Sequence, residues 1–495
     1  MFTLGYDVGS SFVKAAIVDV ERGVVVASAS FPEEEMPIRS PELGWAEQDP
    51  EMWWRAVVGA TRIAASRASI SLQEIRAIGI SYQMHGLVLV DKDGRLLRPS
   101  IIWCDSRATE IGRKAFTDIG EATCLKEMLN SPGNFTASKL RWVKLHEPAI
   151  YEKTYKAFLP GDYIALRLSG EFKTTASGLS EGILWNFPAN SPSNRVLDYY
   201  ELRKDILADL VPSIGFQSAL AAMAAKELGL KPGIPIAYRA GDQPNNAFSL
   251  NVLEPGEIAA TAGTSGVVYA VSGSLNCDPQ SRINAFAHVN HTPQNPRVGI
   301  LLCINGTGIS NSWVRKLAGD SDLTYETMNK LAGDVPIGSR GLSVLPFGNG
   351  AERMLGDRDM GATVNRLNFN VHGKPELFRA VQEGVAFAFN YGIGIMQSLG
   401  IRPKVLRAGA ANMFLSPVFC KTLASVADVT IELHNTDGAQ GAARAAAVGA
   451  GLVPSMKDAF KGLARVQTVE PERNKADYLD AYNLWLNRLN RILND

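Results

Sequence analysis

Two short turns rich in glycine, serine and threonine each lie between two apolar segments of the sequence. The first turn is Gly9-Ser10-Ser11 and the second is Gly263-Thr264-Ser265. Small residues let backbone N–H groups approach an anion closely, and the hydroxyl groups add further donors. Each turn alone is also compatible with an ordinary hairpin. Their pairing, about half a chain apart, favours two phosphate-binding turns.

Two aspartates and a lysine accompany these turns. Asp7 ends an apolar segment directly before the first turn, where it is either a turn-forming side chain or a ligand of hydrated Mg²⁺. Asp242 lies in the segment RAGDQPNNA, where it is either a helix N-cap or a general base. Lys14 either adds positive charge at the phosphates or points into solvent. Phosphoryl transfer needs phosphate donors, a cation and a base for the attacking hydroxyl, and these residues would supply that set.

The segments around both turns predict strands. Residues 2–7, 12–19 and 24–30 predict an antiparallel meander, because apolar runs alternate with glycine-containing turns. Residues 257–262 and 266–271 repeat the strand–turn–strand pattern around the second turn. Two halves that open in the same way indicate a duplicated domain. We expect the junction within the Gly- and Pro-rich stretch 231–255.

Helices are expected between these strands, which predicts an α/β fold. Asp49-Pro50 combines an N-cap with proline at the first helical position, so a helix should continue to residue 68. Further strands are expected at 76–82 and 86–91. Two more helices, over 375–399 and 438–450, are expected in the second domain.

Composition excludes several classes of function. The chain has 495 residues, with 50 basic and 50 acidic side chains, so no basic field favours nucleic acid. The 5 scattered cysteines indicate a reducing compartment. The N-terminal residues lack the pattern of a signal peptide, and no apolar run reaches the roughly 18–20 residues of a membrane span. We therefore expect a cytoplasmic protein that binds small molecules rather than a membrane.

An ordered series of motifs runs almost from end to end of the chain. The series is GYDVGSS at 5–11, WAEQDPEMWW at 45–54, ISYQMHGLV at 80–88, IIWCDSR at 101–107, FTASKLRWVKLHEP at 135–148, LPGDYIALRLSGE at 159–171, AGDQPNNA at 240–247, AGTSGV at 262–267 and AVQEGVAFAF at 380–389. This series resembles the FGGY family of carbohydrate kinases, and its QMHG and W-x-D-x-R motifs are most similar to the xylulokinase group.

This resemblance implies two actin-like (ribonuclease H-like) domains with a cleft between them, which we place at 1–246 and 247–495. It also implies transfer of the ATP γ-phosphate to the terminal hydroxyl of a ketopentose, with D-xylulose expected, and a requirement for Mg²⁺. Asp242 is then the base, and Asp7 lies near the metal and the phosphates. The implied protein is a monomer or a homodimer.

The resemblance also assigns the binding residues. The implied sugar contacts are Met84 and His85, with Trp103, Asp105 and Gln243 as further candidates. Trp103 and Asp105 are equally compatible with structural tasks. The implied ATP contacts are Gly9, Ser10, Ser11, Lys14, Gly263, Thr264, Ser265, Gly308, Gly409 and Asn412. Gly308 is also compatible with close helix packing alone.

Several departures from the family pattern leave the sugar and the nucleotide open. Gln243 follows the expected base, as in glycerol kinases, and the adenosine segment at 407–412 has alanine at two glycine positions. Sedoheptulose, ribulose and glycerol kinases are therefore alternatives, and so is an actin- or chaperone-like nucleotide switch. His288 and His291 resemble a metal pair, but no carboxylate or cysteine cluster completes it, which favours a structural role.

Overall fold

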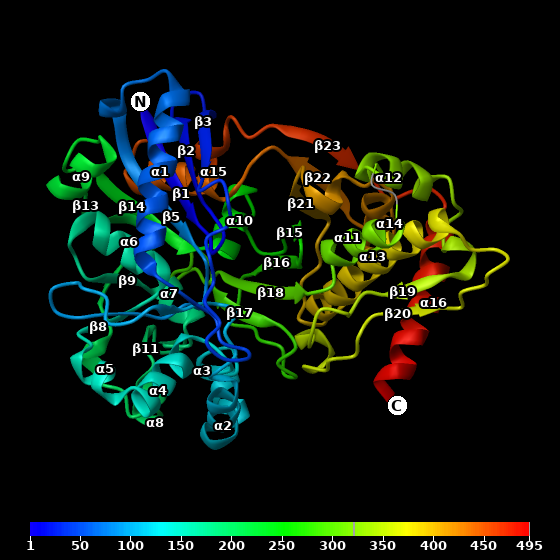
Figure 1. The fold of residues 1–495 in the computed structure, drawn as a ribbon, viewed down its shortest axis with the longest axis horizontal. Helices are drawn as coiled ribbons and strands as arrows, with labels where there is room; N and C mark the ends of the chain where they lie inside the picture. Colours follow the sequence, from blue (N-terminus) through cyan, green and yellow to red (C-terminus); the bar gives the residue numbers. More distant parts are fainter. Residues whose placement is uncertain (320–321, 495) are drawn as a thin grey trace.

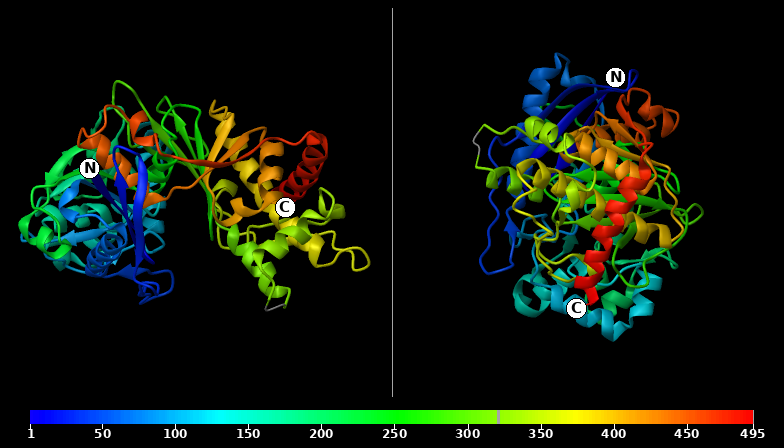
Figure 2. Two further views of the ribbon diagram at one scale, coloured as in Figure 1. Left: turned by 90° about the horizontal axis from the view of Figure 1, so that it is seen from above. Right: turned by 90° about the vertical axis from the view of Figure 1, so that its right-hand side faces the viewer.

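The computed structural model describes residues 1–319 and 322–494, which form two lobes, each built on a β-sheet (Figures 1 and 2). The first sheet contains, in spatial order, β13 (Ile214–Ala219), β14 (Pro235–Gly241), β5 (Ile75–Tyr82), β1 (Phe2–Val8), β2 (Val13–Asp19) and β3 (Val24–Phe31). The second contains β17 (Asn284–Ala287), β18 (Val298–Ile304), β16 (Gly266–Ser272), β15 (Ile258–Ala262), β21 (Val405–Gly409), β22 (Thr430–His434) and β23 (Arg465–Val469).

The two sheets share one topology. Each begins with an antiparallel meander, formed by β1, β2 and β3 in the first sheet and by β15, β16 and β18 in the second. Two strands parallel to the first strand follow, β5 and β14 in one sheet, β21 and β22 in the other. An antiparallel strand, β13 or β23, then lies beside the last of these. This repetition confirms the duplication predicted from the two turns.

Helices surround both sheets, and the helices predicted at 50–68 and 375–399 are present. The carboxylate of Asp49 accepts the N–H of Glu51 at 3.0 Å and begins α1 (Pro50–Ala68). The helix predicted over 375–399 is α13 (Lys374–Ser398). The other helices named in Figure 1 and below are α2 (Thr109–Ile119), α3 (Glu121–Glu127), α4 (Thr136–His146), α5 (Pro148–Lys153), α6 (Pro160–Ser169), α7 (Ala176–Glu181), α8 (Asn194–Tyr199), α9 (Ala222–Leu228), α10 (Asp242–Ser249), α11 (Gly308–Leu317), α12 (Tyr325–Gly333), α14 (Pro417–Ala427), α15 (Gly438–Gly449) and α16 (Lys475–Asn494).

Short strand pairs lie outside the two large sheets. The strand predicted at 86–91 is reduced to β6 (Val88–Val90), which pairs with β8 (Lys156–Phe158). The remaining short strands are β4 (Glu47–Gln48), β7 (Ser100–Ile101), β9 (Lys173–Thr175), β10 (Trp185–Asn186), β11 (Ser191–Pro192), β12 (Asp209–Val211), β19 (Ser343–Leu345) and β20 (Thr363–Asn365). Across the residues described, no helix combines the length and the apolar character needed to cross a bilayer.

Each half of the chain contributes a helix to the sheet of the other half. The helix predicted at 438–450 forms as α15, and it packs on β1, β2 and β5 of the first sheet, a placement that the local sequence did not predict. Alanine and glycine make this approach possible: a Cβ on Gly5 or Gly79 would collide with the backbone of α15. Conversely, α10 follows β14 and buries Ala247 and Leu250 against β15 and β16. The two halves are therefore joined by crossing helices.

Candidate active site

Two adjoining cavities lie where the halves meet. The first, of about 250 Å³, is lined by Asp7, Lys14 and Asp242 from the first half and by Gly409 and Asn412 from the second. The other, of about 440 Å³, shares Ala262 and Asn412 with it and extends over the second half. The two cavities therefore lie side by side: the smaller one is at the junction of the halves, and the other, called the longer cavity below, extends from it over the second half.

The parallel strands of the first sheet bring Asp7 and Asp242 to one edge. In register, Asp7 of β1 lies opposite Ser81 of β5, and Gly241 of β14 lies opposite Tyr82. The Ser81 hydroxyl donates to Asp7 Oδ1 at 2.8 Å, and the Gln243 side-chain amide donates to Asp242 Oδ2 at 3.1 Å. The carboxyl ends of neighbouring parallel strands meet at the same edge, which is why residues so distant in sequence face one cavity.

The surroundings of the two carboxyl groups raise the pKa of both above the ordinary value of an aspartate. Burial, and then the charge of Asp7, raise the pKa of Asp242 to about 7. Burial also raises the pKa of Asp7, while the hydrogen bond from Ser81 and the charge of Lys14 oppose this rise. A carboxylate whose pKa lies near neutral pH is well suited to remove a proton from a hydroxyl. Asp242 can therefore act as a general base.

The residues around Asp7 fit Mg²⁺ better than a metal ion whose ligands all come from protein side chains. No group of three or more His, Cys, Asp or Glu that could hold a metal occurs among residues 1–319 and 322–494. Asp437, which caps α15 by accepting the N–H of Gln440 at 2.9 Å, lines the same cavity as Asp7. Mg²⁺ is commonly held by one or two carboxylates together with waters and substrate phosphates. The donor set matches that chemistry.

Sequence reasoning missed the residues that begin α15. Thr436, Asp437 and Gly438 line the cavity beside Asp7, and a Cβ on Gly438 would collide with the Asp7 carboxylate. The dipeptide Asp437-Gly438 before an alanine-rich helix was a usable signal for a cap. Nothing in the local sequence indicated that this cap would face the first half.

The second Gly/Thr/Ser turn is held against the start of α11. The N–H of Gly308 donates to Gly263 O at 2.8 Å, and the N–H of Ile309 donates to Thr264 O at 3.1 Å. A Cβ on Gly308 would collide with Gly263 O, so close helix packing is a real task of this glycine. Gly263, Thr264 and Gly308 all line the longer cavity. Its unpredicted lining includes Asn311, Tyr325 and Asn329.

The first turn lies outside the lining of both cavities. Gly9 N–H donates to Phe12 O at 3.0 Å and closes the hairpin. The Trp103 indole donates weakly to the Ser10 hydroxyl at 3.4 Å, and Trp103 is 53% exposed. Gly9, Ser10, Ser11 and Ser265 are absent from the lining of the two cavities. The structure thus brings together part of the predicted phosphate-binding set.

Met84 and His85 lie next to the strand end that carries Asp242. A Cβ on Gly241 would stand 2.5 Å from Met84 Cγ, so the thioether chain packs directly on the backbone before Asp242. His85 has a φ of 62°, a strained value for a residue with a side chain. Its ring centroid lies 4.7 Å from that of Phe135 and 5.3 Å from that of Phe286. Burial lowers the pKa of His85 to about 3, so the imidazole is neutral.

The structure argues against the predicted sugar contact of Asp105. Its side chain is 0% exposed, and its Oδ2 accepts the N–H of Ala46 at 2.6 Å and the Arg107 guanidinium at 2.7 Å. The Arg107 guanidinium in turn lies 3.9 Å from the ring centroid of Trp45. Asp105 therefore neutralises a buried arginine, which is the structural alternative that the sequence left open.

His288 also has a structural task. Its Nδ1 lies 3.0 Å from the Tyr269 hydroxyl, and its Nε2 lies 3.1 Å from Val252 O. Both ring nitrogens are therefore engaged within the protein, as expected for the structural alternative.

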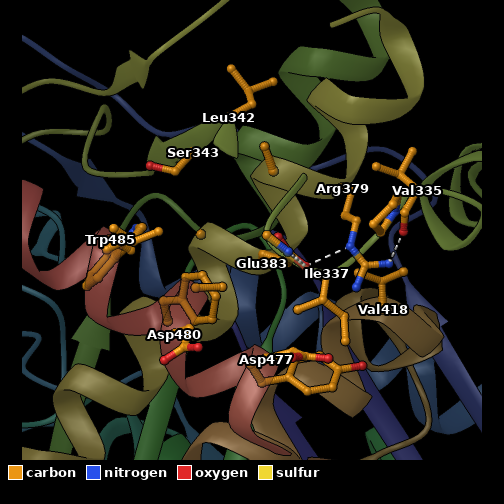
Figure 3. A pocket seen from close by; sticks show the side chains of 18 of the residues that line it. Val335, Ile337, Leu342, Ser343, Arg379, Glu383, Val418, Asp477, Asp480 and Trp485 are labelled. Atoms are coloured by element: carbon orange, nitrogen blue, oxygen red, sulfur yellow. Dashed lines mark hydrogen bonds and ion pairs between the residues drawn. The ribbon is translucent and has the colours of Figure 1, made fainter. Parts of the chain in front are cut away.

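A larger cavity, of about 790 Å³, lies elsewhere, between α16, α13 and α14 (Figure 3). At its wall, Arg379 Nε donates to Glu383 Oε1 at 2.7 Å, and Arg379 Nη1 donates to Val335 O at 2.8 Å. None of the residues predicted for the sugar or for ATP lines it. The two aspartates line the cavity of about 250 Å³ at the junction instead.

Comparison with known proteins agrees with this fold and site. The profile for the N-terminal domain of the FGGY family of carbohydrate kinases matches residues 2–249, and that for the C-terminal domain matches 258–450. Xylulose kinase of Escherichia coli is 30% identical over 479 residues, which cover 95% of each chain. Two solved structures superpose with a TM-score of 0.89: a xylulose kinase from Rhodospirillum rubrum, 25% identical with full coverage of both chains, and a protein described as xyloylose kinase from Brucella ovis, 28% identical with 98% coverage of both. The chain belongs to the FGGY family of carbohydrate kinases and has the two-domain, actin-like fold of that family.

Proposed function

We propose that this carbohydrate kinase transfers the γ-phosphate of ATP to the terminal hydroxyl of D-xylulose, giving D-xylulose 5-phosphate and ADP. Relatives described as xylulose kinases support the sugar, as does the QMHG motif at Met84 and His85. The observation that carries the proposal is the position of Asp242: it lines the junction cavity with Asp7 and is joined through Gly241 to the Met84 contact.

In this reaction Asp242 accepts the proton of the sugar hydroxyl. The hydroxyl oxygen forms a bond to the γ-phosphorus, and the bond between that phosphorus and the bridging oxygen of ADP breaks. Gln243 holds Asp242 Oδ2 through its amide and so limits rotation of the carboxylate. A pKa of about 7 lets Asp242 be deprotonated before the reaction and still accept a proton during it.

Asp7 and Lys14 serve the phosphates in this proposal. Mg²⁺, when bound with ATP, neutralises the charge on the phosphate oxygens, and Asp7 would hold it through water. Lys14 faces Asp7 across β1 and β2 in register and lines the same cavity, which supports a role for its charge in binding the phosphates.

The longer cavity is the proposed site of the nucleoside. Backbone N–H groups and hydroxyls of the turn at 263–265 would bind phosphates. Asn412 lines both cavities, and Gly409 lines the one that holds Asp7 and Asp242. The first turn, at 9–11, would reach the phosphates only after some movement of the halves, because it lies outside both linings.

A coupled assay of ADP release tests the function against D-xylulose, other ketopentoses, sedoheptulose, glycerol and gluconate. We expect the highest kcat/KM with D-xylulose, a product phosphorylated at its terminal hydroxyl by ³¹P NMR, and loss of turnover without Mg²⁺. A higher kcat/KM for another sugar would contradict the assignment of D-xylulose as the substrate. A rate of ATP hydrolysis that no sugar changes would contradict phosphoryl transfer to a sugar and would favour a nucleotide switch.

A further inference from the structure

Behind the proposed sugar site lies a buried polar cluster that includes Glu181. The Tyr82 hydroxyl donates to Glu181 Oε1 at 2.6 Å. Nearby, Arg239 Nε lies 3.2 Å from Asp162 Oδ1, and each of these two side chains is 1% exposed. Arg239 is thus engaged with Asp162, and among the described residues the side chain of Glu181 accepts a hydrogen bond only from Tyr82.

Glu181 is 2% exposed, and its second oxygen has no hydrogen-bond partner among the described residues. That oxygen, Oε2, lies 3.8 Å from His85 Nδ1 and 3.1 Å from the point where a Cβ on Gly241 would stand. It is thus placed between the proposed sugar contact and the residue that precedes the proposed base. An unpaired buried carboxyl oxygen is costly, so its retention at this point calls for a functional reason.

The main chain of Glu181 also sets the state of His85. His85 Nδ1 lies 3.0 Å from Glu181 O, and because a carbonyl oxygen only accepts, Nδ1 carries the proton. The neutral ring therefore presents Nε2 as a hydrogen-bond acceptor, suited to a sugar hydroxyl. Lys139 Nζ holds the carbonyl oxygen of His85 at 2.9 Å, which supports the unusual backbone of this residue.

The helix that carries Glu181 is itself fixed from the second half. In α7, the Ser177 hydroxyl donates to Ala287 O at 3.1 Å, and the Ser180 hydroxyl accepts the N–H of Ala287 at 3.0 Å. The position of Glu181 is therefore determined by β17 as well as by Tyr82. Burial raises the pKa of Glu181 well above its usual range, and the charge of Asp242 acts in the same direction.

We propose that Glu181 is a positioning residue of the sugar site, which fixes the His85 imidazole and the Gly241–Asp242 corner. This inference rests on the proposed roles of His85 and Asp242. Glu181 acts through these neighbours and through Tyr82, whose hydroxyl it orients. It has no contact with the nucleotide cavities.

Two variants and a control test this role. Glu181→Leu removes both oxygens, and we expect a rise of roughly tenfold in KM for the sugar, the size of one lost buried hydrogen bond, with KM for ATP unchanged. Glu181→Gln keeps an acceptor for Tyr82 and should stay within about threefold of wild type. The matched control is Thr174→Val, which removes the 2.9 Å bond from Thr174 Oγ1 to Asp162 in the same cluster. It should lower Tm without changing either KM.

A readout independent of activity separates failure of this inference from failure of the proposed function. ¹⁵N spectra of histidine-labelled protein, with His85 assigned through His85→Gln, should show the Nδ1–H tautomer in all three proteins, because the main-chain carbonyl of residue 181 remains. The His85 ring signals should be displaced in Glu181→Leu, which loses the oxygen 3.8 Å from Nδ1, and should stay close to wild type in Glu181→Gln. The kinetic arm uses whichever sugar the wild-type enzyme phosphorylates. If Glu181→Leu behaves like Thr174→Val, with a lower Tm, an unchanged His85 spectrum and unchanged sugar KM, Glu181 is a core residue only and the proposal is wrong.

Discussion

Asp7 lies one residue before the end of β1, Asp242 directly follows the end of β14, and both side chains line one cavity. Both strands pair in parallel with β5. Their residue numbers differ by nearly half the chain, yet only one strand separates them in the sheet. Their negative charges interact, and the charge of Asp7 contributes to the raised pKa of Asp242. This coupling underlies the first two predictions.

Replacing Asp242 with asparagine should nearly abolish phosphorylation of the sugar and leave sugar affinity close to wild type. Asparagine keeps the size of the side chain but cannot accept the proton, and loss of a general base typically costs about 10²–10⁴-fold in rate. Steady-state kinetics and calorimetric titration with the sugar measure the two effects. A loss of kcat smaller than about tenfold would contradict the assignment of the base.

The same Asp242→Asn substitution should stabilise the protein at pH 8. The folded pKa of Asp242, about 7, exceeds the ordinary value of 3.8, so folding favours the protonated form. Stability from this group is present below pH 3.8 and is lost as pH rises through 7. Asparagine does not ionise, so we expect a Tm gain of about 2–4 °C at pH 8, which corresponds to ~1 kcal/mol, and a smaller gain at pH 5.

Thermal unfolding of both proteins across this pH range measures the effect, with Asp205→Asn as the control. Asp205 is 78% exposed. The same Tm gain at pH 5 and pH 8, or a loss at pH 8, would show that Asp242 is not destabilised by its surroundings.

Met84→Ala and His85→Ala should raise KM for the sugar much more than KM for ATP. Met84 packs against Gly241, and the His85 ring lies between Phe135 and Phe286, away from the nucleotide cavities. One hydrogen bond lost to a hydroxyl corresponds to roughly 0.5–1.5 kcal/mol, or about 2- to 12-fold in KM. Equal changes in both KM values would indicate that the segment has only a packing role.

Gly308→Ala should impair ATP binding and spare the sugar. The added methyl group would collide with Gly263 O and displace the second turn from α11. The matched control is Gly333→Ala in α12, where a Cβ meets no heavy atom within 4 Å. We expect KM for ATP to rise roughly tenfold or more in the first variant, as after loss of one buried contact, and to stay unchanged in the control. An unchanged KM for ATP in Gly308→Ala would show that the turn at 263–265 does not bind the nucleotide.

Binding of both ligands should draw the two halves together. The first turn, at 9–11, lies outside the cavities, and closure would bring it to the phosphates and exclude water. We predict a hinge at 246–255, and the placement of α15 adds a second crossing between the halves. Hydrogen bonds from Asn130 and Ser177 to β17 should keep the halves tied at the opposite end.

Small-angle scattering of the free protein, and of a complex with sugar and a non-hydrolysable ATP analogue, measures this closure. We expect a smaller radius of gyration in the complex. If calorimetry shows that both ligands bind and the radius of gyration is unchanged, the molecule is rigid and the predicted closure is wrong.

Local patterns in the sequence were sufficient to predict several strands and helices and to indicate a phosphoryl-transfer reaction. The meander at 2–30, the helix capped by Asp49 and the two Gly/Ser/Thr turns depend on neighbouring residues, and each is present as predicted. The order of the motifs was likewise enough for the family. The division of the chain at 246/247 and the roles of the site residues remain predictions.

Contacts between distant residues decided what local patterns left open. The α15 helix has an alanine-rich face, and Gly5 of β1 and Gly79 of β5 permit its close approach to the first sheet, because a Cβ at either position would collide with the helix backbone. Asp105 resembled a sugar contact until the fold placed it beside buried Arg107. Glu181 carried no motif, and its position between Tyr82, His85 and Gly241 arises only when α7, β5 and β14 pack together. Sequence determined which groups could react, and tertiary packing determined which of them meet, because burial and charge at the site come from residues far apart in the chain.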